Sequence, residues 1–376
     1  MWHMPRRLVL LAAALVLTAC GGTSEPAPAP ASSAEPAVTP AAAAPQSSNA
    51  EANRLFLDAR AKSLDRSRQG LTGAIALLEK AVRLDRTFAR AYAELALAHG
   101  TLDDATDPLV RRPRAKAAAD RAVALNGSSA AALAARGFVR YRFDWQWTQA
   151  EADFAKAIAA NPDDAFARHQ YGVFLATLGR TDDALREFGR AAELEPGSAA
   201  IRADMVAPLL RARRVADARA AINTFAAAVS GGPLLHQLQS DVLAAEGRLD
   251  ESAESLLKAL SARGVSASRV SDLRTAYKSG GVTAMLERRI RQLTYDVEDG
   301  PSPPGSYRLA TDLALAHATL KHRDQTLHWL AVAIDLHEDA PLYMRSSASF
   351  DFVREDARFK ELLRRAKLVS SPSAGQ

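Results

Sequence analysis

The sequence predicts an all-α fold, an α-solenoid of about eight helix–turn–helix units stacked into a right-handed superhelix with a capping helix at the C-terminal end. Ala, Leu and Arg dominate the 376 residues, and only 6% of the residues are aromatic. Runs of the β-branched and aromatic residues that strands favour are few. A small–large–small residue pattern also recurs at a fixed spacing, which is typical of repeated helical hairpins.

Charge and cysteine content exclude two classes of protein. The formal net charge is +5 at pH 7, and the Arg residues are dispersed among Asp and Glu instead of forming a basic tract. We therefore expect no nucleic-acid partner, because such proteins concentrate their positive charge in a stripe or patch. The single cysteine excludes an intramolecular disulfide framework and a cysteine-rich metal site.

The first element is predicted to be a secretory signal peptide, residues 1–19, which is cleaved. Arg6 and Arg7 precede an apolar run of about ten residues, which is too short to remain in a bilayer as a spanning helix. The run ends in Leu17-Thr18-Ala19-Cys20, which resembles the lipobox of bacterial lipoproteins. An ordinary secretory signal with an incidental cysteine is the alternative.

The lipoprotein resemblance implies an anchor at Cys20. Its thiol would carry a diacylglyceryl group, and its amine would be acylated after cleavage. Two or three acyl chains hold a protein stably, because each buried methylene contributes about 0.8 kcal/mol. Gly21, where an Asp would retain the protein in the inner membrane, favours an outer-membrane lipoprotein facing the periplasm.

Residues 20–50 are expected to form the lipidated cysteine and a disordered tether rich in Pro, Ala and Ser. Six prolines lie between residues 21 and 50, and no apolar periodicity accompanies them. A Pro-rich segment extends at ~3.1 Å per residue, so this one could reach ~90 Å at most. The folded part would then stand clear of the membrane surface.

The repeat is marked by a small residue, a large apolar residue four positions later and a small residue three positions beyond, as in Ala184, Phe188 and Ala191. These offsets lie on one helix face, where small residues let neighbouring helices approach closely. The template recurs at Ala74/Leu78/Ala81, Ala115/Ala119/Ala122, Ala150/Phe154/Ala157, Ala218/Ile222/Phe225, Ser252/Leu256/Ala259, Leu286/Ile290/Leu293 and Thr326/Leu330/Ala333. From Ala150 to Leu286, successive first members are 34 residues apart.

One unit carries a family resemblance. The segment from Ala165 to Pro196 contains Tyr171-Gly172, Leu178-Gly179-Arg180, Ala184 with Phe188 and Ala191, and Leu194-Glu195-Pro196. It resembles a tetratricopeptide repeat, which implies two antiparallel helices in 34 residues. The solenoid is expected over residues 51–345, with degenerate units around Ala218 and Leu286. A capping helix over 346–366 and a disordered tail over 367–376 would follow.

The C-terminal segment from Phe350 to Leu363 and the Phe143-Asp-Trp-Gln-Trp147 motif extend this resemblance. Both are similar to the repeat regions fused to bacterial winged-helix regulators and adenylate cyclases. Trp145 and Trp147 have two interpretations, packing against the next helix or an exposed platform for recognition.

No sequence motif predicts catalysis, so we expect a protein that is not an enzyme and that has no metal or cofactor. No pair among His317, His322, His328 and His337 has the i, i+4 spacing common in zinc sites. The pairs Asp103-Asp104 and Asp163-Asp164 are interpreted as helix caps rather than as acid/base groups.

The tetratricopeptide resemblance implies a concave groove lined by the first helix of each unit. Carrying the family's concave positions onto this chain gives Arg90, Phe138, Tyr141, Arg142, Phe166, His169, Gln170, Thr177, Arg211, Gln237 and Asp241. Packing between repeats is the alternative for Phe138 and Phe166.

The resulting hypothesis is a lipid-anchored scaffold or adaptor that binds protein or peptide partners in the periplasm, for secretion, pilus or outer-membrane protein assembly or for peptidoglycan enzymes. The alternative is a periplasmic sensor that binds a small ligand in a pocket between repeats.

Overall fold

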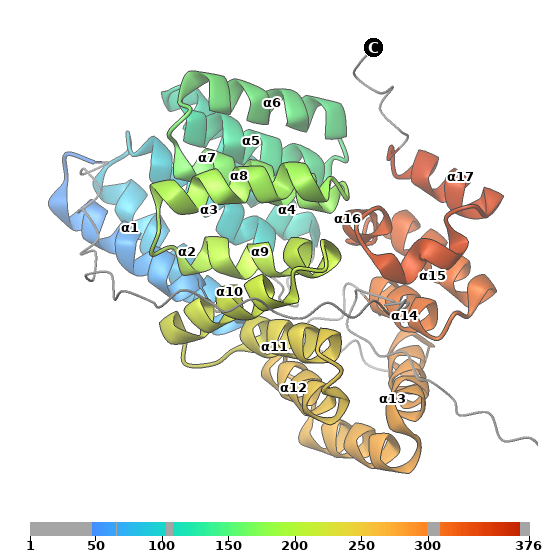
Figure 1. The fold of residues 1–376 in the computed structure, drawn as a ribbon. Coiled ribbons are helices and arrows are strands. Elements are labelled where there is room, and N and C mark those ends of the chain that lie inside the picture. Colours follow the sequence, from blue (N-terminus) through green and yellow to red (C-terminus); the bar gives the residue numbers. More distant parts are fainter. Residues whose placement is uncertain (1–46, 65, 103–107, 299–308, 369–376) are drawn as a thin grey trace, which may run out of the picture.

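The computed structural model describes residues 47–64, 66–102, 108–298 and 309–368. Seventeen α-helices and one 3-10 helix, without any strand, make up the secondary structure of these ranges (Figure 1). The signal peptide, Cys20, most of the tether, Asp103-Asp104 and residues 369–376 lie outside the described residues, so the predictions for them stay predictions. No helix within the described ranges is both long enough and apolar enough to cross a membrane.

Most helices pair as antiparallel hairpins that follow one another along the chain (Figure 1). The pairs are α1 (Ala50–Ser63) with α2 (Arg68–Leu84), α3 (Ala89–Thr101) with α4 (Pro108–Leu125), α5 (Ala130–Phe143) with α6 (Trp147–Ala160), α7 (Ala165–Thr177) with α8 (Thr181–Leu194), α9 (Ala199–Arg211) with α10 (Val215–Ala228), α11 (Pro233–Ala245) with α12 (Leu249–Ala262), and α14 (Leu309–Thr319) with α15 (Arg323–Asp335). The remaining unit is α13 (Ala267–Glu298), in which Gly280 and Gly281 interrupt the helical backbone and divide it in two. The α-solenoid that the sequence predicts is confirmed.

The small–large–small template falls on the second helix of each unit. Its first and third members are buried in all eight units, and Ala184, Phe188 and Ala191 in α8 are 0% exposed. The spacing of these three residues therefore indicates which face of the second helix packs against the first helix of the same hairpin.

Glycines in the first helices let large side chains of the second helices approach the backbone. A Cβ atom on Gly172 in α7 would lie only 2.9 Å from ring atoms of Phe188 in α8, and a Cβ atom on Gly137 in α5 would lie 3.1 Å from Phe154 in α6. The Tyr171-Gly172 motif of the repeat is thus a steric requirement of close helix contact.

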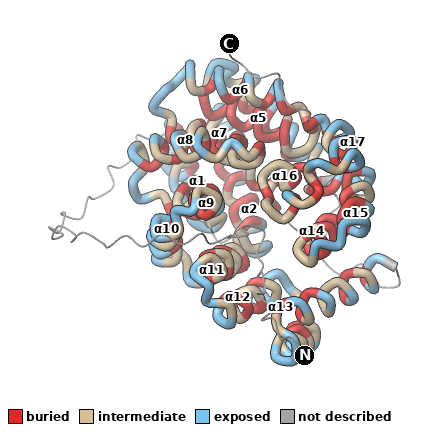
Figure 2. Tube along the Cα trace, turned by 45° about the vertical axis from the view of Figure 1, so that its right-hand side comes forward, coloured by how far each residue is buried: buried red, intermediate tan, exposed pale blue. Residues whose placement is uncertain are grey.

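The C-terminal segment comprises α16 (Pro341–Met344), the 3-10 helix η1 (Ala348–Val353) and α17 (Ala357–Arg365). Helix α17 packs on α15 and buries Phe359 and Leu362. The segment also reaches back to the third hairpin, because the indole nitrogen of Trp147 donates to the carbonyl oxygen of Ala366 at 2.9 Å. The solenoid consequently closes on itself, with α16 near the centre of the view in Figure 2.

Candidate functional site

The concave side of the solenoid encloses a central cavity of about 1690 Å³. Its walls come from the first helices of successive hairpins, from α12, α13 and α14, and from the C-terminal segment. The volume exceeds the roughly 300–1,000 Å³ that is usual for small-molecule pockets. It can therefore hold a ligand larger than one metabolite.

All eleven residues that the sequence analysis placed on the concave groove line this central cavity. They lie on five successive first helices, with Arg90 on α3 and Asp241 on α11 at the two ends, and the others are Phe138, Tyr141, Arg142, Phe166, His169, Gln170, Thr177, Arg211 and Gln237. The structure brings them together as lining. Whether they bind a partner stays a prediction.

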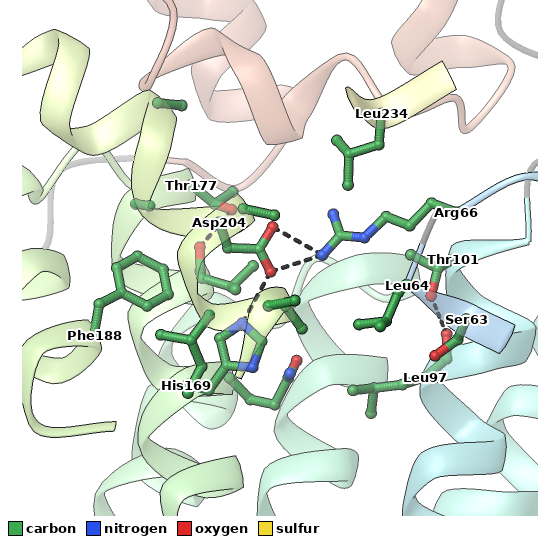
Figure 3. Close-up of a pocket in the computed structure, with 18 of the residues that line it drawn as sticks. Ser63, Leu64, Arg66, Leu97, Thr101, His169, Thr177, Phe188, Asp204 and Leu234 are labelled. Carbon is green, nitrogen blue, oxygen red and sulfur yellow. Dashed lines mark hydrogen bonds and ion pairs between the residues drawn. The ribbon is translucent and has the colours of Figure 1, made fainter. Parts of the chain in front are cut away.

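An ion-pair cluster joins the first hairpin to α9 across the central cavity (Figure 3). Arg66, on the turn between α1 and α2, donates from Nη2 to both carboxylate oxygens of Asp204, at 2.8 and 2.7 Å. The His169 ring nitrogen Nε2 lies 2.9 Å from the same carboxylate. Burial would raise the pKa of Asp204, but the charge of Arg66 and the contact with His169 outweigh it and hold the pKa well below its usual range.

Two more arginines on this side of the central cavity have acidic partners. Arg60 lies 3.1 Å from Glu195 and 3.7 Å from Glu94. Arg90 lies 3.6 Å from both Glu94 and Asp164, and its guanidinium stacks 4.0 Å from the centre of the Phe166 ring. Asp164 also caps α7, as the sequence predicts for Asp163-Asp164, by accepting a hydrogen bond from the backbone of Ala167.

The aromatic residues of α5 serve packing more than recognition. Tyr141 is 3% exposed, and its ring contacts those of Phe138, Trp147, Phe154 and Phe174. Burial raises the pKa of the Tyr141 hydroxyl. Phe138 on α5 and Phe166 on α7 are only 5% and 6% exposed, which favours the interpretation that they pack between repeats. We therefore expect a substitution that removes the Tyr141 ring to destabilise the third hairpin, so such a variant would not report on binding alone.

Trp145 and Trp147 are packing residues, so their interpretation as an exposed platform is wrong. Each is 7% exposed. The Trp145 ring stacks on His337, with centroids 4.8 Å apart, and Trp147 bonds to Ala366 as described above. Both side chains hold the C-terminal segment against the third hairpin.

The opposite wall of the central cavity was anticipated only in part from the sequence, because it includes the end of a second helix, α12, and the degenerate unit around Leu286. It contributes Arg263 at the end of α12 and Arg289 on α13, beside the expected Arg211 at the end of α9. Within the described part of the chain none of these three guanidinium groups forms an ion pair or a side-chain hydrogen bond. We call them the arginine wall.

A carboxyl group lies beside the arginine wall. Asp241 accepts a hydrogen bond from Gln237 at 3.0 Å. Burial raises the pKa of Asp241 to about 7, although this hydrogen bond and the charge of Arg263 act in the opposite direction. This carboxyl group is therefore partly protonated at neutral pH.

The histidines of the last complete hairpin do not converge on a common point. His317 and His322 approach each other, with 3.1 Å between their Nδ1 atoms, and burial together with His322 lowers the pKa of His317 to about 4. The described residues contain no group of three or more His, Cys, Asp and Glu side chains arranged to hold a metal ion.

No protein-family profile and no curated protein matches the chain. Among solved structures, a chain of the APC/C hetero-tetramer Cut9–Hcn1 matches at 16% identity over 85% of this chain and 56% of that chain, with a TM-score of 0.54. This chain thus spans little more than half of its length. PilF of Pseudomonas aeruginosa matches at 17% identity over 68% and 95% of the two chains, and the type IV pilus biogenesis factor PilW at 18% over 58% and 96%, both with a TM-score of 0.37. The chain has the fold of a tetratricopeptide-repeat solenoid.

Proposed function

We propose that the chain is a scaffold or adaptor that binds a polypeptide segment in its central cavity and that a lipid on Cys20 anchors it in the bacterial cell envelope. The observation that carries the proposal is the central cavity, because eleven side chains from five successive repeats converge on it together with a second, degenerate wall. It performs no reaction of its own in this proposal.

The lining of the central cavity suits a polypeptide. Leu97, Leu234 and Leu315 are only half-buried there and offer contacts for apolar side chains. Charged groups lie between them, so the surface matches the mixed apolar and polar character of a peptide chain. Recognition of helices and extended segments in grooves uses apolar anchors of this kind, with polar groups setting orientation.

The envelope location rests on the sequence. The lipobox-like Leu17-Thr18-Ala19-Cys20 and the Pro-rich stretch that follows lead to the first described helix at Ala50. In this proposal the tether holds the solenoid in the periplasm, on the inner side of the outer membrane. Replacing Cys20 with Ser should move the full-length chain from the membrane fraction to the soluble fraction. A variant that stays in the membrane would contradict the lipid anchor.

Site-specific photocrosslinking tests the binding surface in intact cells. We would place benzoylphenylalanine at Leu234, which lines the central cavity, and at Leu336, which is 63% exposed elsewhere on the molecule. The proposal predicts a discrete polypeptide adduct, identified by mass spectrometry, from position 234 and its absence from position 336. The same adducts from both positions, or none from position 234, would contradict it.

A second candidate is a sensor that binds a small ligand, and closure of the central cavity favours it. The C-terminal segment packs so closely on the turn between α7 and α8 that a Cβ atom on Gly179 would lie 2.9 Å from the carbonyl oxygen of Arg345. Thermal-shift screening against peptidoglycan fragments and envelope metabolites separates the candidates. A ligand-dependent shift without any polypeptide adduct at position 234 would favour the sensor.

A further inference from the structure

The arginines of the central cavity divide into two groups. On the side formed by α1 to α7, every arginine that lines the central cavity has an acidic partner within 4.0 Å, namely Arg60, Arg66, Arg90 and Arg142. In the arginine wall, Arg211, Arg263 and Arg289 have none among the described residues. The central cavity therefore carries neutralised charge on one side and unmatched positive charge on the other.

The carboxylates near the arginine wall are already engaged. Asp296 forms two hydrogen bonds with Arg269, at 2.6 and 2.5 Å, and Asp351 pairs with Arg354 at 2.6 Å. Asp312, on α14, offsets part of the charge of Arg289 from beyond ion-pair distance. Asp241, whose pKa burial raises to about 7, is only partly ionised at neutral pH and therefore offsets only part of the charge of Arg263.

Burial is the main influence on two arginines of the arginine wall. It lowers the pKa of Arg289 against the opposing charges of Asp312 and Asp296, with lesser contributions from the charges of Arg269 and Arg263. Burial and the charge of Arg354 likewise lower the pKa of Arg211, against the charge of Asp351. A guanidinium group that loses water without gaining an anion carries a free-energy cost, and this applies to the part-buried Arg211 and Arg289. A ligand that brings carboxylates to these two positions would remove that cost, and a carboxylate beside the exposed Arg263 would match its charge.

Apolar side chains separate the arginines. Leu256 and Leu260 on α12 lie one turn apart before Arg263, and Leu286 and Leu293 on α13 flank Arg289. Leu256 and Leu260 are half-buried, so part of each side chain faces the central cavity, whereas Leu286 and Leu293 are buried. The arginine wall therefore offers two part-exposed leucines on α12 beside its three arginines.

We propose that the polypeptide bound in the central cavity is acidic, with Asp or Glu side chains placed against Arg211, Arg263 and Arg289 and apolar side chains placed against the half-buried leucines of α12. This inference rests on the proposed function and specifies its partner. Complementary charge across an interface selects partners and accelerates their association. The partner is accordingly an acidic segment of another protein that also carries leucine-like residues.

Selection from a library of random twelve-residue peptides on phage, with the full chain as target, tests this composition. We expect enriched peptides to carry a net negative charge, with several Asp or Glu residues among Leu, Ile or Phe. Enrichment of neutral or basic peptides would overturn this inference and leave the proposed function standing. The absence of any enrichment would contradict the proposed function itself.

Charge reversal then locates the contact. The variant Arg263→Glu with Arg289→Glu should bind an enriched acidic peptide about a hundredfold more weakly and should prefer its Lys-substituted twin. The matched control, Arg213→Glu with Arg291→Glu, changes net charge equally at two exposed positions that do not line the central cavity. It should change affinity by less than about threefold. Equal losses in both variants, with circular dichroism unchanged, would overturn the assignment.

Discussion

Arg142 and Asp339, separated by 197 residues in the chain, form a two-point ion pair that fastens the C-terminal segment to α5. Both side chains are 12% exposed, and one of the two hydrogen bonds is 2.7 Å long. The ion pair, the stacking of Trp145 on His337 and the bond from Trp147 to Ala366 act at one place. Together they close the solenoid and fix one rim of the central cavity.

Removing the Asp339 carboxylate should loosen this closure. Asp339→Asn removes the carboxylate from this largely buried ion pair, so we expect the free energy of unfolding to fall by about 3 kcal/mol. Urea denaturation followed by circular dichroism measures the change. Asp351→Asn is the control, because Asp351 is 60% exposed and its loss should cost less than about 1 kcal/mol. Equal effects of the two substitutions would contradict a structural role for the Arg142 pair.

Two glycines on neighbouring helices should respond to alanine in opposite directions. A Cβ atom on Gly172 meets the Phe188 ring at 2.9 Å, so Gly172→Ala should destabilise the chain by about 1–3 kcal/mol. A Cβ atom on Gly189 meets nothing within 4 Å, so Gly189→Ala should stabilise α8 by about 0.5–1 kcal/mol. Thermal unfolding compares them. A change of the same sign in both variants would show that the helix contact is looser than described.

The 34-residue period explains how much of this architecture could be predicted. Because each unit repeats the same contacts, one template correctly placed eight second helices. The tetratricopeptide resemblance supplied the eleven positions that line the central cavity. The closure could not be predicted, since Arg142 and Asp339 belong to no local pattern. Of the arginine wall, Arg211 was placed correctly, whereas Arg263 and Arg289 were missed. Arg263 lies at the end of a second helix, and Arg289 lies in the unit around Leu286, which departs from the template.

Phe154 should be a major contributor to the stability of the third hairpin. It is 0% exposed, and its ring contacts Tyr141, Tyr171 and Phe174. Phe154→Ala should lower the free energy of unfolding by about 4 kcal/mol, because it leaves a cavity among these rings. Leu336→Ala removes an exposed side chain and should change stability by no more than about 0.5 kcal/mol. Similar midpoints for the two variants in urea would contradict the packing described here.

Asp241 should make stability depend on pH. Its pKa is about 7 in the folded chain, against roughly 3.9 in an unfolded one, so the folded chain binds this proton more tightly. The resulting stabilisation is complete below about pH 4 and is lost as the pH rises through 7. Asp241→Asn should therefore be more stable than the wild type at pH 8, with a smaller advantage at pH 5.

Thermal unfolding at the two pH values measures the effect of Asp241. Asp217→Asn is the control, since this carboxyl group is exposed and pairs with Arg214 on the outer surface. It should shift the unfolding temperature little at either pH. An Asp241→Asn variant whose difference from the wild type is the same at pH 5 and pH 8 would show that Asp241 titrates normally.

Placing one bulky side chain in the central cavity tests most directly whether this cavity is the binding surface. Ala207 on α9 lines the central cavity with an exposed side chain, and Ala216 on α10 is exposed but does not line it. Isothermal titration would use the polypeptide segment found in the adduct at position 234. We predict that Ala207→Trp abolishes binding and that Ala216→Trp binds as the wild type does. Undiminished binding by a correctly folded Ala207→Trp variant would contradict the account.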